Sequence, residues 1–194
     1  TTCEKRIITS AAAELRVTKG ATGGKVEGYA AKFGVMSSNL GGFVETIQHG
    51  AFSRAIADKQ DVSFLWMHDR ATLMARTASG TLTLEEDGTG LRFSADLADT
   101  SAARDLIALM GRGDVSQMSF AFNAVRDSWS FDGPIPVRTL IDANLYDVSA
   151  VDTGAYPDTE LGKRSLELAR TKIDNASSEA LRHRNSILRK RVDL

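Results

Sequence analysis

The sequence predicts an α+β fold in which a small, mostly antiparallel β-barrel of about seven strands carries flanking helices and precedes a helical C-terminal tail. Two observations lead to this expectation. Short segments of alternating apolar and polar residues recur along the chain, with glycine-containing turn signals between them. After Pro157 the composition changes to leucines within a charged, alanine-rich background, and no glycine follows Gly162. Strand patterns therefore dominate the first part of the chain and helical patterns the last.

The clearest strand pattern lies at residues 91–97, where every second side chain is apolar and the others are polar. Gly28–Phe33 alternates in the same way. Val62–His68 is apolar on both faces, which is typical of a strand buried from both sides. We expect further strands at residues 14–18, 81–85, 118–123, 137–142 and 145–151.

Two short helices are expected between the strands, at Gly50–Asp58 and Ser101–Met110. Asp99 or Thr100 can cap the start of the second helix, and Gly111 or Gly113 can close it. The chain is expected to divide into an N-terminal extension (1–20), a β-barrel domain (21–157) and a helical tail (158–194) whose end, at 182–191, is basic. The tail is either a solvated helix or a docking segment.

Composition limits the class of protein. The 194 residues suit one domain, with 42% hydrophobic and 25% charged residues. A net charge of −1 argues against a general nucleic-acid binder, and no apolar stretch approaches the roughly 20 residues of a membrane span. Cys3 is the single cysteine, so an internal disulfide is excluded and a reducing, intracellular setting is expected. No metal or cofactor is expected.

Histidine is the commonest general base, and the chain has three histidines. His183 lies in the basic tail, and His49 precedes a helix, where a turn or capping role is natural. His68 ends the apolar segment 62–68, and the end of a strand is a rigid place from which to present a base. His68 is therefore the candidate base, with a purely structural histidine as the alternative.

Ser119 is the best candidate nucleophile. Met118 and Phe120 point to the opposite face of the expected strand, and that face should be the core. Ser119 would then project from a well-anchored strand, although a surface or barrel-lining serine fits the spacing as well. The sequence has no Gly-x-Ser-x-Gly motif, so an α/β-hydrolase is not supported.

A serine hydrolase also needs an acid that orients the base. Asp147 lies within a late strand, where a carboxylate is costly unless it is exposed or paired. Asp69 and Asp152 are alternatives. Asp69 follows His68 directly, and adjacent strand residues face opposite ways, so Asp69 is poorly placed to orient the ring.

The order of the segments is more informative than any one of them. The characteristic stretches are Gly28–Gly34, Glu45–Phe52, Trp66–Asp69 with Ala75–Thr77 downstream, Gln117–Phe122 and Leu145–Val151. With these stretches in this order, the chain resembles the caudovirus prohead protease family, which is distantly related in fold to herpesvirus assemblin. The likeness spans roughly residues 27–157. His49 and Met74 differ from the proline and glycine that are usual in the family.

The resemblance implies a serine endopeptidase with a catalytic triad. His68 falls at the family's catalytic histidine, Ser119 at its nucleophile, and Asp147 where the family has an acidic residue, often glutamate. The implied substrates are the scaffolding protein or the delta domain of the major capsid protein, and the protease itself. Cleavage would occur inside the phage procapsid in the host cytoplasm. A homo-oligomer is a candidate state, and neither a membrane nor a specific nucleic acid is expected as a partner.

Three other functions compete with this interpretation. The barrel type is thought to be shared with phage tail-tube proteins, so a non-catalytic structural protein of phage assembly is the main alternative. Thr1 could act as an N-terminal nucleophile that uses its own amine. A metal phosphohydrolase is suggested only by His68 and Asp69, and such a site would need several more ligands.

Overall fold

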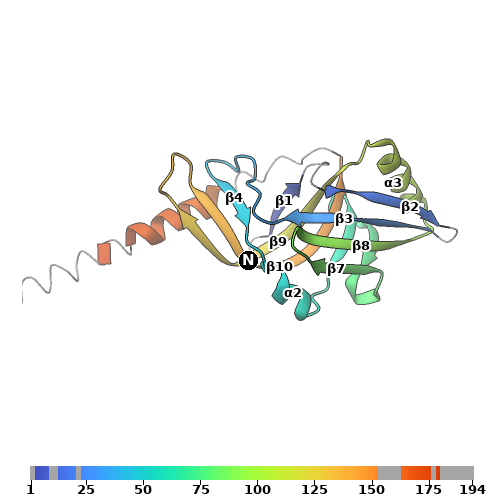
Figure 1. Cartoon of the computed structure of the whole chain (residues 1–194), viewed down its shortest axis with the longest axis horizontal. Coiled ribbons are helices and arrows are strands. Elements are labelled where there is room, and N and C mark those ends of the chain that lie inside the picture. Colours follow the sequence, from blue (N-terminus) through green and yellow to red (C-terminus); the bar gives the residue numbers. More distant parts are fainter. Residues whose placement is uncertain (1–2, 9–12, 21–22, 153–162, 176–177, 180–194) are drawn as a thin grey trace, which may run out of the picture.

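The computed structural model describes residues 3–8, 13–20, 23–152, 163–175 and 178–179. These residues form a mixed α+β fold in which two β-sheets face each other across the core (Figure 1). The sheets have six and four strands, and no ladder joins them within this part of the chain. The α+β class is as predicted, but the closed barrel of about seven strands is replaced by two open sheets. The expected number was too small because several strands lack the alternation of apolar and polar residues from which the strands were predicted.

Sheet A contains the two longest strands. Its order is β1–β9–β10–β5–β6, with β4 pairing with β10 as well. Both β4 and β5 lie parallel to β10, one at each end, whereas the other pairs are antiparallel. The bounds are β1 (Glu4–Ile8), β4 (Val44–Ile47), β5 (Ser63–Trp66), β6 (Asp69–Arg76), β9 (Gln117–Ser130) and β10 (Val137–Val151).

Sheet B is antiparallel throughout, in the order β2–β3–β8–β7. Its strands are β2 (Arg16–Gly20), β3 (Gly23–Lys32), β7 (Leu82–Glu86) and β8 (Gly90–Ala98). The range 1–20, expected to precede the domain, therefore contributes β1 to sheet A and β2 to sheet B. The division of the chain at residues 20 and 157 stays a prediction.

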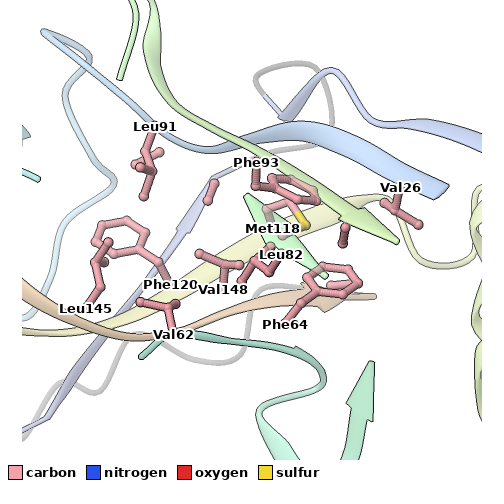
Figure 2. Packing of buried hydrophobic residues seen from close by; sticks show 14 of the residues in the cluster. Val26, Val62, Phe64, Leu82, Leu91, Phe93, Met118, Phe120, Leu145 and Val148 are labelled. Atoms are coloured by element: carbon pink, nitrogen blue, oxygen red, sulfur yellow. The ribbon is translucent and has the colours of Figure 1, made fainter. Parts of the chain in front are cut away.

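The core lies between the sheets (Figure 2). Leu91 and Phe93 of β8 meet Phe64 of β5 and Phe120 of β9, and all four are fully buried. The rings of Phe64 and Phe93 stack with centroids 5.4 Å apart. Burial of such a side chain contributes roughly 1.5–3 kcal/mol, so this contact holds the two sheets together.

Helix α3 (Ser101–Arg112) follows the sequence prediction closely. Thr100 is its N-cap, and the Thr100 hydroxyl accepts a hydrogen bond from the backbone N–H of Ala103. Gly113 closes the helix with a φ of 84°, a left-handed conformation that favours glycine. The other expected helix is shorter, at α2 (Ser53–Ala57), and a 3₁₀ turn η1 (Thr77–Ser79) follows β6.

Part of the predicted tail is a helix at residues 163–175. Its Leu166 packs with Leu40 and Phe43 in a small cluster beside Trp129 and Phe131. Residues 182–191, which carry the basic charges, lie outside the described residues. No helix in the described ranges is both long and apolar enough to cross a membrane.

Strand β1 is held by a buried ion cluster: Glu4, Arg6, Glu45 and Arg138 are buried, and Asp127 at its margin is half-buried. Arg6 donates from Nε to Glu45 at 2.8 Å, and Arg138 donates from Nη1 to Glu4 at 2.7 Å and from Nε to Asp127 at 2.7 Å. Because these pairs join β1, β4, β9 and β10, they fix the place of β1 at the edge of sheet A.

Candidate active site

The structure brings together the three residues singled out as a possible triad. The Nε2 atom of His68 lies 2.7 Å from the Ser119 hydroxyl, and its Nδ1 atom lies 2.6 Å from Oδ1 of Asp147. Both distances are those of hydrogen bonds. The three residues come from the β5–β6 turn, β9 and β10, and the side chains of His68 and Asp147 are only 5% and 13% exposed.

Ser119 lies on the face of sheet A that points away from the core. Its neighbours Met118 and Phe120 are fully buried in the core cluster, so alternation along β9 directs Ser119 to the opposite face, as predicted. Its cross-strand partners are Ile7 on β1 and Ser149 on β10. Pairing on both sides holds the strand, and Ser119 itself is fully buried.

His68 lies in a turn rather than at the end of a strand as expected. Strand β5 stops at Trp66, which pairs with Asp69 at the start of β6, and Met67 and His68 form the two-residue turn between them. Both turn residues have a φ of 58°. This left-handed conformation is normal for such a turn but usually requires glycine or asparagine. The turn directs the imidazole back over sheet A.

Asp147 reaches the same face because β10 contains a β-bulge. Leu145 pairs with Phe122 and Asp147 pairs with Ala121, so Tyr146 has no partner of its own in the ladder. The extra residue reverses the alternation: Leu145 is buried in the core, whereas Asp147 faces His68. A bulge beside a site commonly redirects a side chain in this way.

Ser149 is a fourth member of the site, and the sequence analysis did not find it. Its hydroxyl donates to Oδ1 of Asp147 at 2.7 Å and lies 3.1 Å from Nδ1 of His68. Ser149 is fully buried and lies directly opposite Ser119. Two residues apart on one strand share a face, so the spacing of Asp147 and Ser149 could have indicated this contact.

The alternative candidates lie elsewhere or serve local roles. His49 is exposed and contacts the ring of Phe33, with centroids 4.9 Å apart. Asp69 accepts a hydrogen bond from the backbone N–H of Ala71 within β6. His183 and Thr1 lie outside the described residues. In the described ranges, no group of three or more His, Cys, Asp or Glu side chains is placed to hold a metal ion.

Cys3 is exposed and lies near the candidate site. Partial burial, together with the negative charge of Asp147, raises the pKa of the Cys3 thiol. Since the thiolate is the reactive form of cysteine, a raised pKa disfavours Cys3 as a nucleophile.

This arrangement can activate a hydroxyl. A neutral imidazole that carries its proton on Nδ1 and donates it to Asp147 presents a free Nε2 to the Ser119 hydroxyl. The hydroxyl can then lose its proton to Nε2 as its oxygen attacks a carbonyl carbon.

Comparison with known proteins shows to which family the chain belongs. The model of the caudovirus prohead serine proteases matches residues 11–174, most of the chain. The chain belongs to this family. The family suggests a serine peptidase, and the resemblance noted from the sequence is thereby confirmed. A search of curated proteins found no match.

One solved structure is similar to this prohead protease family member: the capsid assembly protease of bacteriophage T4, gp21. The TM-score is 0.50 at 13% sequence identity, and the alignment covers 79% of this chain and 99% of the T4 chain. At this identity the likeness shows the fold alone. The expected likeness to herpesvirus assemblin stays a prediction.

Proposed function

We propose that this protein is a serine endopeptidase in which Ser119 is the nucleophile, His68 the general base and Asp147 the acid that orients the base. The observation that carries the proposal is the continuous hydrogen-bonded series from Ser119 through His68 to Asp147, with contacts of 2.7 Å and 2.6 Å. Nucleophile, base and orienting acid are the parts that acyl transfer by serine needs, and membership of the prohead serine protease family supports the same chemistry.

The proposed mechanism is acyl transfer by a serine. Ser119 attacks the scissile carbonyl while Nε2 of His68 takes its proton, and the imidazolium then gives that proton to the leaving amine. Asp147 stabilises the imidazolium through Nδ1. Water, activated by His68 in the same way, then hydrolyses the acyl-enzyme and regenerates the Ser119 hydroxyl.

We further propose that the substrates are the proteins that build a phage procapsid: the scaffolding protein or delta domain of the major capsid protein, and the protease itself. Support comes from the family description and from the T4 fold neighbour, which is named a capsid assembly protease. A procapsid inside the host cell would hold enzyme and substrate at high effective concentration. Self-association of the protease stays a prediction.

The experiment is intact-mass analysis after co-expression with the cognate capsid protein. Wild type is compared with Ser119→Ala and with Ser128→Ala, which removes an exposed serine from the same strand, β9. We expect discrete truncations with wild type and Ser128→Ala, and none with Ser119→Ala. Uncut protein in assembled shells from all three would favour the structural, tail-tube-like alternative. Equal cutting by all three would exclude Ser119 as the nucleophile.

A further inference from the structure

The Nδ1 side of His68 has two partners, where a triad requires only one. Asp147 Oδ1 lies 2.6 Å from Nδ1, and the Ser149 hydroxyl lies 3.1 Å from the same nitrogen and 2.7 Å from the same Oδ1. Nδ1, Oδ1 and the Ser149 Oγ thus form a closed triangle of polar atoms. A hydroxyl can donate to the carboxylate and still accept from the ring N–H.

The backbone fixes this hydroxyl. Ser149 pairs with Ser119 on one side and with Leu65 on the other, and its neighbours Val148 and Ala150 are fully buried in the core. Ser149 is itself fully buried. Burying a hydroxyl without partners costs free energy, and the partners found here both belong to the proposed triad. The hydroxyl is therefore held on these two atoms by a strand that is paired on both sides.

We propose that Ser149 is a positioning residue of the protease: it orients the Asp147 carboxylate and the His68 ring together. This inference rests on the proposed function. Ser149 does not touch the scissile bond. Its O–H donates to the carboxylate oxygen that faces Nδ1, so the carboxylate and the ring share one fixed partner.

Removal of the hydroxyl should lower kcat more than it changes KM. The ring and carboxylate lose a shared contact, so Nε2 is held less well on the Ser119 hydroxyl and kcat falls. Because Ser149 does not touch the scissile bond, KM should change little.

The test compares wild type with Ser149→Ala, Ser149→Thr and Ser94→Ala, the last of which removes a half-buried serine from sheet B. Steady-state hydrolysis is measured with a peptide spanning a cut site found in the co-expression experiment. For Ser149→Ala we expect kcat to fall about 10- to 100-fold with little change in KM. Ser149→Thr, which keeps the hydroxyl, should restore kcat, and Ser94→Ala should match wild type.

If Ser149→Ala does not fold, Ser149→Cys replaces it, since a thiol of similar size is a weaker donor and should also lower kcat with little change in KM.

The outcomes separate the inference from the proposed function. Active wild type with an unchanged kcat in Ser149→Ala would overturn the inference and leave the protease intact. A variant that is only less stable, with the kcat of its folded protein unmoved, would overturn it as well. Cleavage that survives Ser119→Ala would overturn the proposed function, and the inference with it.

Discussion

Leu145 and Asp147 are two positions apart on β10, yet their side chains lie on opposite faces of sheet A. In a regular strand such residues share a face. Here the unpaired Tyr146 between them reverses the alternation, so that Leu145 is buried in the core and Asp147 lies 2.6 Å from His68. Because of the bulge, β10 contributes Leu145 to the core and Asp147 to the candidate site on the opposite face.

Deletion of Tyr146 should therefore either abolish proteolysis or lower stability. Without the extra residue, either Asp147 leaves His68 or Leu145 leaves the core, and the second outcome costs about 2–5 kcal/mol of unfolding free energy, as for loss of a large buried side chain. Tyr146→Ala keeps the bulge and removes a side chain that is 36% exposed, so it should keep its activity. Urea unfolding and the cleavage assay measure both effects. A deletion variant with wild-type activity and wild-type stability would show that the bulge does not place Asp147.

The turn that presents His68 should be stabilised by Met67→Asn. Met67 has a φ of 58° and is 45% exposed, so its side chain loses little on replacement. Asparagine adopts this conformation more readily, and we expect the free energy of unfolding to rise by about 0.5–1 kcal/mol. Met67→Ala removes the same side chain but keeps the backbone cost, so it should show no gain. Equal stability of the two variants in urea would argue against strain at this position.

Asp147→Asn should leave the fold intact and lower kcat by about 10⁴-fold. An amide in place of the carboxylate can still contact His68, but it carries no charge to stabilise the imidazolium and it favours the wrong tautomer. KM should change little, because Asp147 lies behind the ring and away from Ser119. Single-turnover kinetics on a cleaved peptide measure the effect. Activity above a tenth of wild type would remove Asp147 from the proposed triad.

How far the sequence predicts this structure depends on whether the local pattern and the fold agree. The alternation around Ser119 places Met118 and Phe120 in the core as expected, and Thr100 caps α3 as its residue type indicates. Strand β1 was not recognised, because its buried Glu4 and Arg6 contradict the usual rule that strand residues facing the interior are apolar.

The geometry of the candidate site was harder to predict for a similar reason. The turn at His68 contains neither glycine nor asparagine, so its residue types conceal a left-handed conformation. The bulge at Tyr146 depends on the register between β9 and β10, which only the paired strands determine. Ser149 could have been found from its spacing to Asp147, but its place opposite Ser119 follows only from that register.

The last prediction concerns the buried ion cluster that holds β1 beside β9. Burial alone would raise the pKa of Glu4, but the hydrogen bond from Arg138 and the charges of Arg138 and Arg6 outweigh it, so the pKa is lowered. A lowered pKa in the folded state stabilises the protein at pH values above that of an unfolded glutamate, about 4.3, and this contribution is lost as the pH falls through the folded value. Stability should therefore decline below about pH 4.

Glu4→Gln tests this directly. At pH 7 we expect it to lower the free energy of unfolding by about 3 kcal/mol, because Arg138 and Arg6 lose a buried partner. The difference from wild type should shrink as the pH falls below about 4.3, the pKa of an unfolded glutamate, and the loss is complete once the pH lies below the folded pKa of Glu4, where wild type is protonated as well. Glu85→Gln, which breaks an exposed pair with Arg92, should change stability by less than about 1 kcal/mol at either pH.

Because Ile7 of β1 pairs with Ser119, a loss of β1 at low pH should also reduce cleavage. Urea unfolding at pH 7 and pH 3 decides the matter: a Glu4→Gln effect that is the same at both values would mean that the charge of Glu4 does not hold the strand.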